Sequence, residues 1–325
     1  MVASSPTRSR IEWIDLARGA ALVAMAIYHF TWDLEFFGYT EPGMTAVGGW
    51  KYFARSIAST FLVLVGVSLV LSHAGGFRMP SFLRRFAMIA GAAAAVTIAT
   101  WIATPDFFIF FGILHQIAFA SVAGLLFLRS PPLLTLAVAA LIIAAPFFVT
   151  STAFDAPWWW WTGLSENRPR SSDYVPVFPW FAAALIGIAA AKLADRAGLF
   201  AWIARFEPGG WSKSLQFAGR HSLAVYLIHQ PVLIGCLWLF AQVYPAPVQT
   251  SEVRFRYSCE ASCEQVRSEE FCAGYCVCVL DGLAADNRLE EAFSRAPSDA
   301  FRAKLKDMAE ICTAETDATI GPEPE

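Results

Sequence analysis

The stretch IDLARGAALVAMAIYHFTWDL, residues 14–34, is the most informative part of the chain for its fold, because it has the length of a membrane span and yet carries four ionisable side chains. These are Asp15, Arg18, His29 and Asp33. An ionisable group in hydrocarbon is costly unless it is paired or hydrated. On an α-helix that turns about 100° per residue, all four lie within a sector of about 60°. We therefore expect this face of the helix to line a polar cavity inside a bundle of helices.

Composition places the whole chain in the membrane class. Of its 325 residues, 56% are apolar and only 16% are charged, and the mean hydropathy is positive. The net charge of −3 conceals a division, because residues 1–249 carry a balance of +5 and residues 250–325 a balance of −8. Two regions in different solvents are implied. The expected partner of the first region is the lipid bilayer, and no nucleic-acid partner is expected.

Seven stretches approach the roughly 20 apolar residues that a spanning helix needs. They cover residues 13–37, 51–72, 83–104, 107–128, 132–151, 174–194 and 221–244. The predicted fold is an all-α, polytopic membrane helix bundle of about seven spans with a small helical, cysteine-rich tail domain. We divide the chain into an N-terminus (1–10), a transmembrane domain (11–249) and an acidic tail (250–325), whose last residues are expected to be disordered.

Basic residues gather on one side of the predicted bundle. With residues 1–10 in the cytoplasm, most lysines and arginines lie on the inner side, and the outer loops keep mainly Lys51, Arg168 and Arg170. Such a bias sets the orientation of a membrane protein. Seven spans then leave the tail outside. We therefore expect a multi-pass protein of the inner (plasma) membrane with a cytoplasmic N-terminus and a periplasmic tail.

The cysteines test this topology independently, because six of the seven lie in the tail. They are Cys259, Cys263, Cys272, Cys276, Cys278 and Cys312. An even number in an oxidising compartment favours disulfides. Two pairs stand four residues apart and share a helix face, so two antiparallel helices could be joined by two bridges, with Cys278 and Cys312 as a third pair. Six cysteines allow fifteen pairings, and a four-cysteine zinc site would be favoured if the tail were cytoplasmic.

Other predicted spans supply polar side chains that could face the four ionisable residues of the first helix. FGILHQIA places His115 and Gln116 at a depth similar to that of His29. GRHSLAVYLIHQP places Arg220 and His221 at the inner end of the last span. His229 follows eight residues after His221. No pair of histidines has a recognised metal-ligand spacing, so no metal is expected.

Four consecutive tryptophans, residues 158–161, lie on the predicted outer side, just before TGLSENRPR. Tryptophan is enriched at membrane interfaces, which favours simple anchoring. A platform on which a sugar ring stacks is the alternative, and Trp160 is its candidate residue.

Five segments, in this order, resemble the bacterial DUF1624 group, which is related to heparan-α-glucosaminide N-acetyltransferase. They are RIEWIDLARGAALVAMAIYHFTWDL, FLVLVGVSLVL, FGILHQIA, SSDYVPVFPWFAAALIGIA and GRHSLAVYLIHQPVL, and the resemblance covers about residues 10–245. The D-x-x-R-G start and the spacing from Arg18 to His29 also resemble the acyltransferase-3 family, whose corresponding histidine is regarded as catalytic.

The resemblance implies a membrane acyltransferase that passes an acetyl group from cytoplasmic acetyl-CoA to a hydroxyl or amine of a sugar or glycan outside. Asp15, Arg18 and His29 match the acyltransferase-3 motif. The catalytic histidine of the lysosomal enzyme lies between its first catalytic-domain span and the next, and here that segment, EFFGYTEPGMTAVGG, contains no histidine. The cysteine-rich tail has no counterpart in the resemblance.

Acyl transfer needs a base with a pKa near neutrality, for which histidine is best suited. We expect His29 to be that base and Asp33, one turn later, to stabilise its imidazolium. His115 and Gln116 would position the acceptor or stabilise the developing oxyanion. The other predicted acceptor-binding residues are His229 and Trp160.

At the inner end of the bundle, Arg18, Arg220 and His221, with Asp15 of the motif, would suit the phosphates of coenzyme A. Two other classes of function stay open. Histidines and carboxylates in spans are equally typical of a transporter or a proton-coupled channel. The chain could also be a non-catalytic membrane anchor whose disulfide-linked tail binds a periplasmic protein partner.

Overall fold

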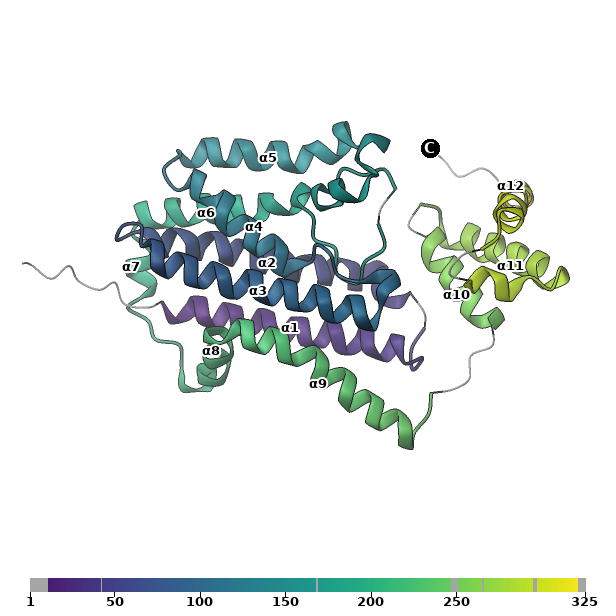
Figure 1. Ribbon diagram of the computed structural model, residues 1–325, viewed down its shortest axis with the longest axis horizontal. Coiled ribbons are helices and arrows are strands. Elements are labelled where there is room, and N and C mark those ends of the chain that lie inside the picture. The colour runs from purple at the N-terminus through teal and green to yellow at the C-terminus, as the bar shows by residue number, and fades with distance from the viewer. Residues whose placement is uncertain are drawn as a thin grey trace, which may run out of the picture. The chain divides into compact units, whose positions relative to one another are not determined.

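The computed structural model describes residues 11–41, 43–167, 169–246, 251–264, 266–294 and 297–320. These residues form α-helices and short 3₁₀ helices, and no strand (Figure 1). The α-helices are α1 (Glu12–Phe36), α2 (Gly48–His73), α3 (Met79–Ala103), α4 (Ile113–Ala123), α5 (Pro132–Val149), α6 (Val177–Arg196), α7 (Leu199–Ile203), α8 (Lys213–Arg220), α9 (Ser222–Val243), α10 (Ser251–Cys263), α11 (Glu269–Ala285) and α12 (Asp299–Ile320). The 3₁₀ helices are η1 (Met44–Ala46), η2 (Pro105–Phe107), η3 (Gly124–Phe127), η4 (Thr152–Phe154), η5 (Pro157–Thr162), η6 (Gly210–Ser212) and η7 (Leu289–Phe293).

Five of these helices, α2, α3, α5, α6 and α9, are long and apolar enough to cross a membrane. They coincide with five of the seven predicted spans. Helix α1 has 25 residues, but its apolar sequence is interrupted by the four ionisable residues of its polar face. Helix α4 and η3 together cover Ile113–Phe127, which is shorter than the other spans. The prediction of an all-α, multi-pass membrane protein is confirmed.

The chain divides into two compact units. One comprises Met1–Met25 with Arg55–His229, and the other comprises Ala26–Ala54 with Gln230–Glu325. In the first unit, half of the apolar window of α6 is buried, against 17% for α3 and for α5. Helix α6 is therefore the central helix of this unit, whereas α3 and α5 turn most of their apolar surface outward, as a lipid-facing helix does.

Two glycines allow α2 and α6 to approach closely in the first unit. A Cβ on Gly66 would lie 2.1 Å from the carbonyl oxygen of Ala184, and a Cβ on Gly187 would lie 2.2 Å from the carbonyl oxygen of Val63. Small residues at such crossings let backbones pack together where lipid provides no hydrophobic driving force. The core beside this crossing is apolar and includes Leu185.

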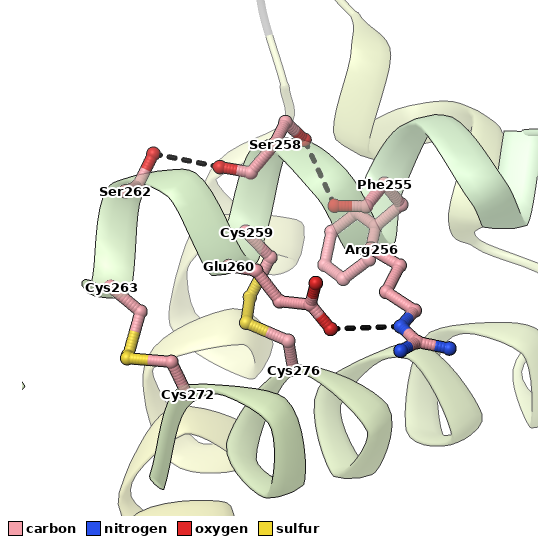
Figure 2. The surroundings of a disulfide bond; sticks show 9 residues. All are labelled: Phe255, Arg256, Ser258, Cys259, Glu260, Ser262, Cys263, Cys272 and Cys276. Carbon is pink, nitrogen blue, oxygen red and sulfur yellow. Dashed lines mark hydrogen bonds and ion pairs between the residues drawn. A yellow bond between two sulfur atoms is a disulfide. The ribbon is translucent and has the colours of Figure 1, made fainter. Parts of the chain in front are cut away.

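Three disulfides join the helices of the tail: Cys259–Cys276, Cys263–Cys272 and Cys278–Cys312. Figure 2 shows the first two, which are neighbouring bridges between α10 and α11. This is the pairing expected of two antiparallel helices with cysteines four residues apart. The third bridge ties α11 to α12. A small apolar core that contains Val279, Leu283 and Phe301 packs beside it.

We predict that Gly66→Ala lowers the stability of the first unit. The added methyl group overlaps the Ala184 carbonyl, so α2 and α6 must separate, at a cost of roughly 1–3 kcal/mol. Thermal denaturation of the purified protein in detergent measures the loss. Gly91→Ala in α3 is the matched control, because a Cβ there meets nothing within 4 Å. Equal melting temperatures for the two variants would contradict the close crossing.

We also predict that the Cys278–Cys312 bridge stabilises the tail more than Cys263–Cys272 does, because the bridges span 34 and 9 residues. Loop-closure entropy gives about 4 and about 3 kcal/mol. Paired Cys→Ser variants of the full-length protein, compared by limited proteolysis of the tail, provide the measurement. Thiol titration of the denatured, unreduced protein should find one reactive thiol, Cys236. More than one would show that the bridges do not form.

Candidate functional site

The D-x-x-R-G motif builds a charged cluster at the start of α1. Asp15 is buried, with 2% of its surface exposed, and its Oδ1 accepts a hydrogen bond from Arg18 Nη1 at 2.9 Å. Arg18 Nη2 also donates to the Ser68 hydroxyl on α2. Arg220, at the end of α8, places its Nε 3.7 Å from Asp15 Oδ2. A buried carboxylate between two guanidinium groups is compensated on both oxygens, which is what burial of a charge requires.

Two glycines bring α8 to this cluster. A Cβ on Gly19 would lie 2.0 Å from the carbonyl oxygen of Leu215, and a Cβ on Gly219 would lie 1.8 Å from the carbonyl oxygen of Asp15. The glycine of the motif and the glycine before Arg220 therefore permit one close crossing of α1 and α8. Without it, Arg220 could not reach Asp15.

This geometry divides the residues predicted for the donor phosphates into two groups. Asp15, Arg18 and Arg220 are brought together, and the two arginines are engaged with Asp15. His221 lies outside the cluster: it is exposed, its Nδ1 is 3.0 Å from the carbonyl oxygen of Phe217, and its ring packs on the Phe217 ring. Arg18 and Arg220 thus hold their helices together in this structure.

In the second unit, Asp33 pairs with a residue that sequence reasoning missed. Asp33 is fully buried, and its Oδ1 accepts a hydrogen bond of 2.6 Å from Gln230 Nε2 on α9. Within the described part of the chain, Asp33 Oδ2 and Gln230 Oε1 have no hydrogen-bond partner. His29 is half-buried one turn before Asp33, on the same face of α1. In the sequence, the feature that could have indicated Gln230 is an amide next to His229 in an otherwise apolar helix.

A second carboxylate fixes the loop that follows α1. Glu35 accepts hydrogen bonds from the backbone N–H groups of Gly43, at 2.6 Å, and Thr45, at 3.0 Å, and from the Thr45 hydroxyl at 2.7 Å. Glu35 was not a predicted site residue. Its contacts hold the loop against the helix end that carries His29 and Asp33.

The start of α4 holds His115 by both ring nitrogens. Nδ1 accepts from the backbone N–H of Gly112 at 3.3 Å, so Nε2 carries the proton and lies 3.2 Å from the Thr97 hydroxyl. That hydroxyl donates in turn to the carbonyl oxygen of Ile109 at 2.7 Å. A neutral imidazole with both nitrogens engaged suits a positioning role better than that of a free base.

Gln116, the next residue, differs from His115 in its hydrogen bonding. It is fully buried in α4, and neither its Oε1 nor its Nε2 has a hydrogen-bond partner among the described residues. A buried amide without partners costs the desolvation of both groups. Such exceptions are rare and call for an explanation. Binding of a polar ligand is the explanation that fits the predicted role of Gln116.

Asp173 caps α4 from a distant segment and was also missed from the sequence. Its Oδ2 accepts a hydrogen bond of 2.8 Å from the backbone N–H of Ile113. A Cβ on Gly112 would lie 2.3 Å from the same oxygen, which explains the glycine there. Burial raises the pKa of the Asp173 carboxyl to about 6, against the lowering effect of that hydrogen bond. In the sequence, the feature that could have indicated Asp173 is its position just before the apolar residues of SSDYVPVFPWF.

The remaining predicted residues serve local structure here. Trp160 donates from Nε1 to the carbonyl oxygen of Asp155 at 2.8 Å, and its own carbonyl oxygen accepts from the Tyr174 hydroxyl at 2.6 Å. The other three tryptophans of the run are exposed, which fits interfacial anchoring. His229 Nδ1 lies 2.6 Å from the carbonyl oxygen of Tyr226, one turn earlier on α9.

We predict a pH-dependent effect of Asp173→Asn on stability. Because the pKa of the folded state, about 6, exceeds the ordinary value of 3.8, this carboxyl adds stability below pH 4 that is lost as the pH rises through 6. Asparagine does not titrate. Melting curves in detergent from pH 4 to pH 8 should therefore show the variant gaining on the wild type as the pH rises. A difference that stays constant or changes in the opposite direction would contradict the buried-carboxyl assignment.

Comparison with known proteins supplies the family. A family model described as "Heparan-alpha-glucosaminide N-acetyltransferase, catalytic" matches residues 10–231. No curated protein and no solved structure gives a match. The matched segment includes the motif cluster, His29, the α4 cluster and Gln230, and it leaves out the disulfide-linked tail. The chain belongs to the heparan-alpha-glucosaminide N-acetyltransferase catalytic-domain family.

Proposed function

We propose that this membrane protein transfers an acetyl group from acetyl-CoA to a hydroxyl or amine of a sugar or glycan. The observation that carries the proposal is the hydrogen bond between the buried Asp33, one turn from His29, and the half-buried Gln230. One buried oxygen on each side chain is left without a partner in the described structure. A polar acceptor would supply the missing hydrogen bonds. Membership of an N-acetyltransferase family supports the reaction class.

In this proposal His29 is the general base. Its imidazole removes the proton from the acceptor hydroxyl, or from an acceptor amine in its neutral form, as the oxygen or nitrogen attacks the thioester carbonyl. The new C–O or C–N bond forms, the C–S bond breaks, and the proton passes from the imidazolium to the departing thiolate. The carboxylate of Asp33 stabilises the imidazolium between these steps, and Gln230 keeps that carboxylate in place.

The other clusters would position the reacting groups. Gln116 is a buried amide whose unsatisfied groups would bind a polar part of a substrate. His115 orients the start of α4 through its two hydrogen bonds. The Asp15–Arg18–Arg220 cluster fixes the start of α1 against α8.

The proposed topology places the N-terminus in the cytoplasm, where acetyl-CoA is available, and the tail in the periplasm. The distribution of basic residues and the three disulfides support this orientation. The acceptor glycan is then presented on the periplasmic side, and a periplasmic protein is the candidate partner of the tail.

The test is transfer of a labelled acetyl group from acetyl-CoA to a panel of amino and hydroxy sugars by the purified, reconstituted protein. We expect His29→Ala to lower kcat about 100-fold or more, because a general base contributes roughly 10²–10⁴. Asp33→Asn should lower it at least about tenfold, because the imidazolium loses its counter-charge. Phe30→Ala is the matched control, since Phe30 is next to His29 and is exposed.

Three outcomes would reject this function. Wild-type protein that consumes no acetyl-CoA with any acceptor would remove the reaction, and normal turnover by His29→Ala would remove the base. Movement of a sugar or of protons into donor-free liposomes, with no acetyl transfer, would instead identify a transporter or channel. Mass spectrometry of envelope glycans from cells that carry wild-type or His29→Ala protein would identify the natural acceptor.

A further inference from the structure

A cavity of about 870 Å³ lies in the first unit, around the turn that joins α2 to α3. Its wall is formed by the end of α2, residues 74–78 of the turn and the first turns of α3, with Ser121 of α4 and Asp195 of α6. The volume lies within the range of about 300–1,000 Å³ that is typical of small-molecule sites.

The cavity contains two arginines without partners. Arg78 and Arg85 both line it, and in the described structure neither side chain makes a hydrogen bond or an ion pair. Asp195 is the carboxylate that the described lining contains. The wall therefore carries more positive than negative charge. Unpaired guanidinium groups in a concave site are well suited to phosphate.

The glycine turn leaves its backbone accessible. Gly76 has a φ of +103°, a conformation that residues with a side chain rarely adopt. A Cβ on Gly75 or on Gly76 would meet no atom within 4 Å. A ligand can therefore approach the main chain at this turn without displacing a side chain.

Part of the wall is apolar and adjoins the motif cluster. Val65 and Leu69 of α2 line the cavity on either side of Ser68, the residue to which Arg18 donates. Phe82 and Phe86 of α3 contribute further apolar surface. A lining that combines basic groups with apolar surface matches a ligand that has phosphates and a long, less polar arm.

We propose that this α2–α3 cavity binds the phosphate groups of the acyl donor through Arg78 and Arg85, an inference that rests on the proposed acetyl-CoA-dependent function. In this assignment Arg78 and Arg85 bind the phosphates in place of Arg18 and Arg220, which are engaged with Asp15. The phosphorylated nucleotide end of coenzyme A occupies the arginine side, and its pantetheine arm follows Val65 and Leu69 toward the motif cluster.

The experiment measures binding of coenzyme A and of pantetheine, which lacks the phosphates, to full-length protein in nanodiscs of neutral lipid. Arg78→Ala and Arg85→Ala should each weaken coenzyme A binding about tenfold or more and leave pantetheine binding unchanged, because a charge-assisted hydrogen bond is lost. Arg84→Ala is the matched control, since this neighbouring arginine does not line the cavity. Arg85→Lys, which keeps the charge, should restore part of the affinity.

The outcomes separate this inference from the proposed function. Coenzyme A binding by the wild type that is unchanged in Arg78→Ala and Arg85→Ala overturns the cavity assignment and leaves the acyltransferase proposal standing. No binding of coenzyme A or acetyl-CoA by the wild type overturns the proposed function itself. If nanodiscs with anionic lipid abolish the effect of both substitutions, the arginines bind a lipid phosphate instead, and the donor assignment is wrong.

Discussion

The first unit depends on one buried carboxylate. Asp15 has almost no exposed surface, and the cost of burying its carboxylate is offset because Arg18 and Arg220 approach its two oxygens. Those contacts exist because Gly19 and Gly219 have no side chains and let α1 and α8 cross at backbone distance. The D-x-x-R-G motif is thus first a device for packing helices. Its arginine is the link to Ser68 on α2, whose neighbours form the wall of the cavity.

Hydrogen-bond satisfaction separates structural from functional groups more sharply than residue type does. Glu35 and His115 are polar groups in an apolar bundle, and their partners tie them to the fold. Asp33 and Gln116 are fully buried and Gln230 is half-buried, and each keeps at least one buried atom without a partner in the described structure. Native proteins tolerate few such atoms. The proposed chemistry is placed where they occur, because an acceptor or an oxyanion would satisfy them.

Much of the fold and part of the site could be predicted from the sequence. Five predicted spans match helices within a few residues, since length and apolarity are local properties. The stripe on α1 followed from helical spacing, and the cysteine spacing anticipated two antiparallel helices. Gln230, Asp173 and Glu35 escaped, because each acquires its importance from a contact with another segment. Gln230 is paired with a residue 197 positions earlier, and no periodicity reveals such a partner.

The membrane class, the helical spans, the polar face of α1 and the even set of tail cysteines follow from the amino-acid sequence alone, because composition and periodicity are local properties of the chain. Tertiary structure decided which arginines are free. Arg18 and Arg220 are engaged with Asp15, whereas Arg85 lines a cavity and its neighbour Arg84 does not. It also decided which buried amides lack partners. The physical reason is that charge pairing and hydrogen-bond satisfaction depend on which distant segments meet, whereas hydropathy depends on neighbours in sequence.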